Sequence, residues 1–451
     1  MKNTQPTFRK YSAAGTDWAA WLVGIGLGLT LALQVTTMRL SDVNNVYSAI
    51  ASTSRLAALT GTYFAVVGIF LVARIPWVEK GVGHDRLVTW HRNLGPWSLY
   101  LIGLHVLLVV LAFAGQDHVM LVVELWRMLH TYFWMWPALA GFVSMIAAGV
   151  TSYKKARAKM SYETWWMVHI LTYAAVALSF MHQVLNGQMF VNHPLNRLYW
   201  TLLYVLMALA IIVYRFGIPT VRSLRHNLVV DKVVVEGPGI VSVIMRGRKL
   251  HLLAAEGGQF FGWRFMARGH MLMSHPYSLS AAPTEHFLRI TVKDLGDHSR
   301  SLANIKRGTR VFVEGPYGAF VAGRATRPHV LLVGGGVGIT PIRALMDEFK
   351  GGVQMTVIYR ASTPADLVLK EELDYLVANS NGSITINYLV GSRREHPMNA
   401  KALKVLAPRV SDSDIYICGP EPLVEAVREA AAELGVPKNR FHDEAFAFHK
   451  E

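Results

Sequence analysis

Six apolar stretches dominate the first half of the chain. An α-helix needs about 20 apolar residues to cross a bilayer, and each stretch has about this length. The stretches lie near residues 18–37, 55–75, 92–114, 131–151, 165–185 and 198–217. The pattern therefore predicts a six-helix transmembrane domain over residues 1–220.

The periodicity changes from about Leu228. Short runs of alternating β-branched residues, such as LVVDKVVVE and FLRITVKDL, are separated by Gly and Pro, and this pattern predicts an antiparallel β-barrel over residues 221–325. After Arg327, apolar runs such as HVLLVGGG and QMTVIYR alternate with helical segments. That alternation is typical of βαβ units and predicts an α/β domain with a parallel sheet over residues 326–451. The predicted fold is a multi-domain membrane protein.

Composition and charge support a membrane location. The 451 residues are 52% hydrophobic and 17% charged, with a net charge of +15; ordinary globular chains have roughly 25% charged residues. Such a charge would suit nucleic acid or a membrane surface. Fourteen Lys and Arg flank the spans on one side and three lie in the alternate loops, so both termini are expected in the cytoplasm. We expect the lipid bilayer as a partner and no nucleic acid.

Two further features bound the protein. The first apolar run is not closed by a small-residue cleavage site, so no cleaved signal peptide is expected. Cys418 is the only cysteine, which excludes an intrachain disulfide.

Four histidines lie within two of the apolar stretches. His91 and His105 stand at positions i and i+14 in the third stretch, and His169 and His182 at i and i+13 in the fifth. A single membrane histidine often makes an interhelical hydrogen bond. Four at matched depths favour haem iron, for which imidazole is the usual axial ligand. We expect one haem between His91 and His169 near the cytoplasmic face and another between His105 and His182 about 21 Å away.

The two spacings are not equivalent on a helix. A step of i to i+14 returns to within about 40° of the same face, whereas a step of i to i+13 leaves two side chains about 140° apart. The fifth span must therefore tilt, distort or present its two rings from different flanks. Gly95 and Gly103 would let a flat ring approach the third span, or would serve close helix packing.

A glycine-rich turn follows a buried strand in HVLLVGGGVGITP, which ends at Pro341. Glycines let the backbone approach a pyrophosphate, which the helix starting at Pro341 would favour, although tight strand–helix turns have the same composition. Cys418 is either a small buried residue or a sulfur beside a nicotinamide. The candidate nucleotide-binding residues of these two segments are Gly334, Gly335, Gly336, Gly338, Thr340, Pro341, Cys418, Gly419 and Pro420.

Arg360 ends the next strand, at a position that can meet the adenosine ribose. An arginine there suits a 2′-phosphate, unless it is a solvated surface residue. Ser362, Arg393 and Arg394 are expected to assist. This favours NADPH and leaves NADH open.

The segment HPYSLSAAP suits a flavin. Tyr277 could stack on the ring and Ser278 could hydrogen-bond near its reactive nitrogen, while Gly296 and Ser299 lie at a turn suited to the flavin pyrophosphate. Taken alone, each is also ordinary barrel sequence.

With these motifs the chain resembles the NADPH oxidase and ferric reductase superfamily, from the second span to the C-terminus. The likeness rests on the histidine spacings, the HPF-type motif at His275, the GD-x-T-like loop at Gly296, and GGGVGITP and CGP. It implies two bis-histidine b haems, an FAD barrel and a nucleotide domain of ferredoxin–NADP reductase type. The FAD residues that it implies are His275, Pro276, Tyr277, Ser278, Ser280, Gly296, His298, Ser299 and Phe446.

The resemblance also implies an activity. Electrons would pass from cytosolic NADPH through FAD and two haem b groups to an acceptor on the outer face. Cys418, Ser278 and Phe446 would act at the flavin and nicotinamide, with Thr340 ordering the nicotinamide and Phe448 as the alternative to Phe446. The location implied is the plasma or inner membrane.

The acceptor stays open. Arg55 matches an outer-side arginine of the family, but Val109 stands where eukaryotic oxidases carry a further histidine. O2 giving superoxide is favoured, with a ferric chelate as the alternative. An electron-transfer subunit for a partner protein or quinone is a further hypothesis, and a haem carrier or passive membrane protein is another. No obligate regulatory subunit is evident.

Overall fold

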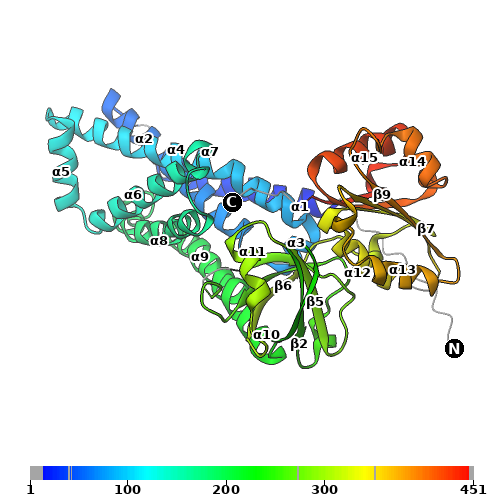
Figure 1. Cartoon of the computed structure of the whole chain (residues 1–451). Coiled ribbons are helices and arrows are strands. Elements are labelled where there is room, and N and C mark those ends of the chain that lie inside the picture. The colour runs from blue at the N-terminus through cyan, green and yellow to red at the C-terminus, as the bar shows by residue number, and fades with distance from the viewer. Residues whose placement is uncertain (1–13, 39–40, 42, 272–273, 350–351, 446–451) are drawn as a thin grey trace. The chain divides into compact units, whose positions relative to one another are not determined.

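The computed structural model describes residues 14–38, 41, 43–271, 274–349 and 352–445 (Figure 1). They form two compact units, Ser12–Gly217 and Ile218–Glu451. The domain boundaries expected near residues 220 and 325 stay predictions. The helices of the first unit are α1 (Ala14–Thr37), α2 (Val46–Leu71), α3 (Pro76–Val82), α4 (His84–Asp117), α5 (Leu121–Thr131), α6 (Met135–Ser152), α7 (Lys154–Arg157), α8 (Tyr162–Asn186) and α9 (Pro194–Ala210), followed by a π-helical segment, Ile211–Gly217.

The second unit contains strands and shorter helices. The strands are β1 (Val229–Gly237), β2 (Ile240–Arg246), β3 (Phe260–Phe265), β4 (His275–Ser278), β5 (Phe287–Lys293), β6 (Val311–Tyr317), β7 (His329–Gly335), β8 (Gln354–Ala361), β9 (Ile384–Val390), β10 (Asp414–Gly419) and β11 (Phe441–Ala445). The helices are α10 (Ile218–His226), α11 (Asp297–Ser301), α12 (Ile339–Glu348), α13 (Lys370–Ala378), α14 (Ala400–Leu406) and α15 (Glu421–Glu433).

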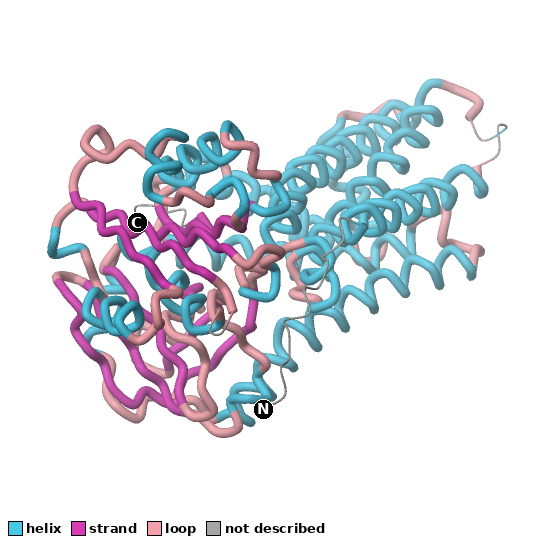
Figure 2. The backbone as a smooth tube through the Cα atoms, turned by 90° about the vertical axis from the view of Figure 1, so that its right-hand side faces the viewer, coloured by secondary structure: helices cyan, strands magenta, loops and turns pink. Residues whose placement is uncertain are grey.

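Six helical segments in the described residues are long and apolar enough to cross a membrane, as predicted. They are Trp18–Thr37, Val46–Leu71, Arg86–Asp117, Met135–Ser152, Glu163–Asn186 and Pro194–His226. Helix α2 packs against α4, and α6 packs against α8; Figure 2 shows the long helices as a bundle of rods. Large apolar side chains remain outside, such as Trp21 at 71% and Leu195 at 78% exposure. A bilayer would cover them.

The spans differ from the expectation at their ends. Helix α4 begins at His84 and continues past Pro96, and the sixth span extends through the π-helical segment into α10. Helix α5 has only 11 residues and buries one face through Glu124, Met128 and Leu129. It was not predicted because it is too short to resemble a span.

The antiparallel strands form two three-stranded sheets, in the orders β1-β2-β5 and β4-β3-β6. Isolated bridges connect the two sheets, including one from Leu279, directly after β4, to Ile290 in β5. Alternate residues of β3 point into the shared core, where Phe261, Trp263 and Phe265 are fully buried. The barrel expected from the alternation is therefore built as two linked sheets.

The last five strands form a parallel sheet in the order β11-β10-β7-β8-β9, as predicted. Strand β7 is buried almost continuously, which is typical of a central parallel strand covered on both faces. Residues of α12 and α13 pack on one face, and residues of α14 and α15 on the other. This arrangement places the glycine turn after β7 and the CGP segment after β10 at the same edge of the sheet.

Candidate functional site

The structure brings His91 of α4 and His169 of α8 together. Their ring centroids are 5.9 Å apart and their planes differ by 79°. His91 Nδ1 lies 2.9 Å from the carbonyl oxygen of Gly68 on α2. His169 Nδ1 lies 3.4 Å from Ser152 Oγ, and Trp165 stacks on the His169 ring at 5.0 Å. Because each Nδ1 has a partner, each Nε2 is left for a ligand.

This pair fits axial ligation of a haem. With metal–nitrogen bonds of about 2 Å and about 1 Å from nitrogen to ring centre, two imidazoles on one iron have centroids about 6 Å apart. The observed 5.9 Å agrees with that separation. Two imidazoles alone are few ligands for a bare metal ion, whereas a haem supplies the other four nitrogens.

The outer histidines are less closely paired. Ser54 Oγ of α2 lies 2.8 Å from His105 Nδ1 and 3.1 Å from the His105 carbonyl, and the Ser54 carbonyl lies 3.2 Å from the same Nδ1. His182 is half-buried on α8. In the part of the chain that the structure describes, no ring contact joins His105 to His182. Helix α8 is unbroken, so His169 and His182 leave it from flanks about 140° apart.

Open space, not helix packing, lies beside Gly95 and Gly103. A Cβ added to either would meet no atom within 4 Å. At Gly61 and Gly141 a Cβ would meet neighbouring helices at 2.9 Å and 2.8 Å. Gly95 and Gly103 therefore fit the approach of a flat ring better than the packing alternative.

Sequence reasoning missed the partners of the histidines. Gly68 and Ser54 on α2 have the same spacing along the chain as His91 and His105 on the antiparallel α4. The matched spacing was the available signal. Arg55, the predicted acceptor-site residue, follows Ser54 and is half-buried.

The flavin motif forms β4, and one of its polar atoms is buried without a hydrogen-bond partner among the described residues. Ser278 is 5% exposed and its Oγ is that atom. A buried hydroxyl without a partner fits a missing ligand. Ser280 differs, because its Oγ accepts hydrogen bonds from Arg289 Nε and Thr291 Oγ1 at 3.0 Å and 2.8 Å.

Three histidines lie together beside Tyr277. The His275 and His298 rings stack at 3.4 Å, and His298 Nε2 lies 2.8 Å from Nδ1 of His270, a residue that the sequence did not single out. The Tyr277 hydroxyl lies 3.3 Å from His298 Nδ1. Burial, with His275 and His270 adding to it, lowers the pKa of His298 to about 3. The cluster is therefore neutral at His298 near pH 7.

The predicted flavin-pyrophosphate loop borders an open hollow of about 500 Å³. Gly296 lies on its wall with Asp294 and Arg300, which form an ion pair at 2.8 Å. Ser299 Oγ is engaged within the loop, since it accepts from the Leu295 N–H at 2.8 Å. Pro276 is exposed next to Tyr277. Phe446 and Phe448 lie outside the described residues.

The structure brings the glycine turn and the CGP segment together. Gly334 of β7 pairs with Cys418 of β10. A Cβ on Gly338 would lie 2.2 Å from the Cys418 carbonyl oxygen, and one on Gly335 would lie 3.0 Å from the Pro420 ring. Helix α12 starts at Ile339, two residues before the predicted start, because the turn Gly336–Gly338 is itself a 3₁₀ turn. Both segments lie at the carboxyl ends of parallel strands, where nucleotides bind in open α/β sheets.

The side chains of this edge differ in access. Cys418 is fully buried, and burial together with Glu444 raises the pKa of its thiol, which stays protonated. Thr340 donates to the Val337 carbonyl at 3.0 Å. Arg360 is 8% exposed and donates to the carbonyls of Leu389, Gly391 and Ser392 at 3.2–3.4 Å. Ser362, Arg393, Gly419 and Pro341 complete the predicted set, with Ser362 and Arg393 exposed.

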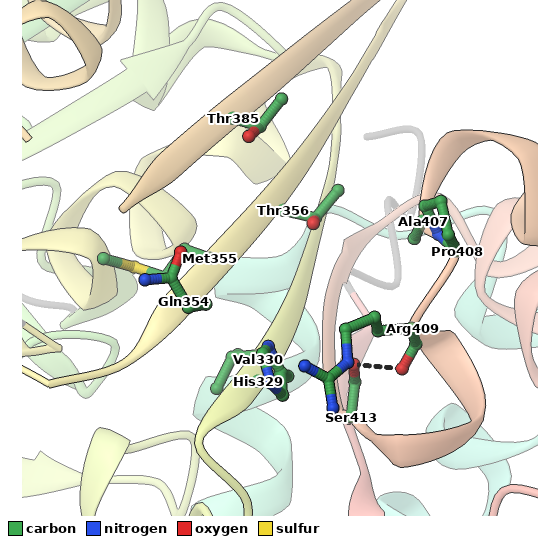
Figure 3. Close-up of a pocket in the computed structure, with 10 residues that line it drawn as sticks. All are labelled: His329, Val330, Gln354, Met355, Thr356, Thr385, Ala407, Pro408, Arg409 and Ser413. Carbon is green, nitrogen blue, oxygen red and sulfur yellow. Dashed lines mark hydrogen bonds between the residues drawn. The ribbon is translucent and has the colours of Figure 1, made fainter. Parts of the chain in front are cut away.

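Another hollow, of about 190 Å³, lies at the opposite edge of the parallel sheet (Figure 3). His329 and Gln354, which start β7 and β8, line it together with Arg409 and Ser413. Since dinucleotides bind at the carboxyl edge, this hollow is not the predicted nucleotide site.

Known families match three successive parts of the chain. The family described as "Ferric reductase like transmembrane component" matches residues 57–180, an FAD-binding domain matches 226–321 and an oxidoreductase NAD-binding domain matches 332–429. The chain has the architecture of the NADPH oxidase and ferric reductase superfamily. It is a membrane protein and an oxidoreductase with FAD- and NAD-binding domains.

Curated relatives match up to about half of the chain. The glycine betaine monooxygenase reductase subunit of Pseudomonas aeruginosa is 29% identical over 49% of this chain and 64% of its own length. The ferredoxin reductase component of 3-ketosteroid-9-alpha-monooxygenase from Mycobacterium tuberculosis is 31% identical over 42% and 54%. The chain thus spans between half and two thirds of the length of these relatives.

Solved structures also match about half of the chain. The FAD/NAD-binding domain of nitric oxide dioxygenase from Vibrio cholerae has 25% identity and a TM-score of 0.40, and the match covers 49% of this chain and 99% of that domain. The cytochrome b5 reductase domain of Ulva prolifera nitrate reductase has 17% identity and a TM-score of 0.43, over 49% and 98%.

Proposed function

We propose that this superfamily member moves electrons from NADPH across the membrane to an acceptor on the outer face, with O2 as the preferred acceptor and superoxide as the product. The observation that carries the proposal is the His91–His169 pair, 5.9 Å apart and oriented by Gly68 and Ser152. It lies in a chain that also has FAD- and NAD-binding domains. Such a combination suits one enzyme with its own electron source.

The proposed cofactors are FAD, two haem b groups and NADPH, with NADH possible in its place. FAD supplies the conversion of two-electron nicotinamide chemistry into single-electron steps, and b haems supply single-electron carriage. His91 and His169 would hold one haem, and His105 and His182 the other. The buried Ser278 hydroxyl would bind the flavin, and the glycine turn would admit the nucleotide pyrophosphate.

The proposed orientation follows the positive flanks of the spans. Both termini would face the cytoplasm, so the nucleotide would bind there and the His105–His182 level would face outward. The proposed location is the plasma or inner membrane. No nucleic acid and no obligate regulatory subunit are part of the proposal.

Ferric-chelate reduction is the second candidate. Val109 stands where eukaryotic oxidases carry a further histidine, and this difference favours a ferric chelate over O2 as the acceptor. An electron-transfer subunit for a partner protein or quinone is the third. Arg55, half-buried at the outer end of α2, is the proposed acceptor-side residue.

One experiment tests the proposal. The purified full chain with its haem and FAD is reduced anaerobically with NADPH while haem absorbance is followed; air with a superoxide trap, or ferric citrate, is then added. We expect haem reduction, then reoxidation by air with superoxide. Reoxidation by ferric citrate without superoxide supports the second candidate, and failure of both acceptors supports the third.

A variant separates the membrane segment from the flavin. In His105→Leu we expect loss of the outer haem and of acceptor reduction, with NADPH-driven flavin reduction retained. His118→Asn, at the exposed end of α4, is the matched control. Unchanged haem content in His105→Leu would contradict the ligand assignment.

A further inference from the structure

Two arginines and two carboxylates connect the antiparallel sheets to the helices of the parallel sheet. Arg289 lies on β5, Arg343 and Asp347 lie on α12, and Glu372 lies on α13. Their side chains are largely shielded, with exposures of 16% for Arg289, 9% for Arg343, 15% for Asp347 and 27% for Glu372. Two arginine and two carboxylate side chains therefore meet in a shielded place.

Glu372 is the carboxylate that both arginines share. Arg289 Nη1 donates to Glu372 Oε2 at 2.9 Å and Arg289 Nη2 donates to Oε1 at 3.2 Å, which is a bidentate pair. Arg343 also pairs with Glu372 and with Asp347. In a Glu372→Gln variant, the two guanidinium groups would face each other with only a neutral carboxamide between them.

The network holds the end of the flavin motif. Arg289 Nε donates to Ser280 Oγ at 3.0 Å and Arg289 Nη2 donates to the Ser280 carbonyl at 2.6 Å. Asp347 Oδ2 accepts the Ala282 N–H at 3.5 Å. Ser280 follows Ser278, with its buried hydroxyl, by two residues.

The same network holds the helix of the nucleotide motif. Helix α12 begins directly after the turn Gly336–Gly338 and carries Arg343 and Asp347. Glu348, at its end, accepts the Gly257 N–H from the segment before β3 at 2.8 Å. The flavin motif and the nucleotide turn are thus tied to one ionic cluster centred on Glu372.

We propose that Glu372 is a positioning residue for hydride transfer, because it fixes the flavin motif relative to the nucleotide turn through Arg289 and Arg343. The inference rests on the proposed function. With both cofactors bound, the C4–H bond of the nicotinamide would break and the hydride would move with its electron pair to the flavin, so NADPH would be oxidised and FAD reduced. Glu372 takes no electrons or protons in this step.

The test uses the full chain with bound FAD, mixed anaerobically with NADPH while flavin absorbance is followed. A misplacement of about 1 Å can slow a reaction by about 10²-fold, so we expect Glu372→Gln to lower the limiting rate of flavin reduction roughly tenfold. The NADPH concentration for half-maximal rate should change less than the rate, because the glycine turn itself is intact. Glu371→Gln, on the exposed face of the same helix, is the matched control.

Glu372→Asp supplies the signature of charge balance. It keeps a carboxylate between Arg289 and Arg343, so its limiting rate of flavin reduction should be higher than that of Glu372→Gln. If Glu372→Gln binds no FAD, Glu372→Asp should still bind FAD and is compared with the unmodified chain. A Glu372→Asp variant no faster than Glu372→Gln, or a Glu372→Gln variant with the unchanged rate, overturns the proposal.

A structural readout separates this inference from the proposed function. Hydrogen–deuterium exchange of Ser280–Ala282 and α12, without NADPH, should be faster in Glu372→Gln than in the unmodified chain. Faster exchange with no NADPH-driven flavin reduction in the unmodified chain would overturn the proposed function alone. Unchanged exchange in Glu372→Gln would contradict the proposal that Glu372 fixes the flavin motif relative to the nucleotide turn, even if the unmodified chain reduces its flavin.

Discussion

Replacing Gly338 with alanine should disable the nucleotide turn. The added Cβ would lie 2.2 Å from the Cys418 carbonyl oxygen, 2.6 Å from its carbonyl carbon and 2.9 Å from Gly419 Cα, whereas ordinary contacts begin at 3.4 Å. The glycine turn and the Cys418–Gly419 backbone would have to move apart until the distance from the new Cβ to the Cys418 carbonyl oxygen reaches 3.4 Å. The opposing atoms are all backbone, in a strand paired on both sides with β7 and β11. These backbone atoms can therefore move only if the carboxyl end of β10 shifts relative to its neighbouring strands.

The expected magnitude follows from that displacement. Overpacking of this kind costs about 1–3 kcal/mol of stability, and a displacement of about 1 Å at a reacting centre costs about 10²-fold in rate. The assay is anaerobic NADPH-driven flavin reduction, together with thermal unfolding of the full chain. Gly382→Ala is the control: it adds the same methyl group at a glycine with φ +80 and no atom within 4 Å, so it has backbone strain without a clash. A Gly338→Ala variant with unchanged flavin reduction and unfolding temperature would refute the reasoning.

Two other predictions concern the histidines. Ser54→Ala should weaken haem retention at His105 by about tenfold, because a hydrogen bond to the other nitrogen of a ligating imidazole contributes about that much; the Ser54 carbonyl still lies 3.2 Å from Nδ1. Haem content and a spectroscopic redox titration measure the effect. Thr53→Ala, whose hydroxyl donates to the Ala49 carbonyl within α2, is its control; equal haem content and potentials in both variants would contradict it. The folded-state pKa of His298 is lowered to about 3 from 6.5, so the unfolded state binds the extra proton between these values and stability should fall as pH drops through that window. In His298→Gln the fall in unfolding temperature between about pH 7 and about pH 4 should be shallower, whereas in the exposed His286→Gln control it should be unchanged; equal slopes in all three proteins would argue against buried neutral His298.

The sequence predicts elements best where one physical requirement dominates. Bilayer thickness sets the length of an apolar run, so six spans could be predicted from length alone. The apolar run HVLLV and the glycine turn after it likewise predicted a parallel sheet with a nucleotide-binding edge. Helix α5 was missed because its 11 residues satisfy neither requirement.

Contacts between side chains far apart in the chain could not be predicted from the hydrophobic pattern of the sequence. Arg289 and Glu372 are 83 residues apart, and the only local signal of either is an ordinary charge on a strand or helix. His270 and His298 are 28 positions apart in the chain. Arg360 could be placed at a strand end, but its donation to carbonyls at the end of β9 and in the following loop depends on how that loop folds back. Such contacts follow from packing and not from periodicity.

The packing of α2 against α4 explains why the structure orients the histidine pair of the inner predicted haem more completely than that of the outer one. His91 lies beside Gly68 and His105 lies beside Ser54. The two histidines on α4 and their two partners on the antiparallel α2 thus have the same spacing along the sequence. Helix α4 can therefore present both rings from nearly one face, each with its Nδ1 held by α2. On α8 the shorter i to i+13 step turns His182 about 140° from His169. The inner rings meet at 5.9 Å because both are oriented by neighbouring helices. At the outer level the α2 contact orients His105 alone, so the geometry of His182 decides how the outer group would be held.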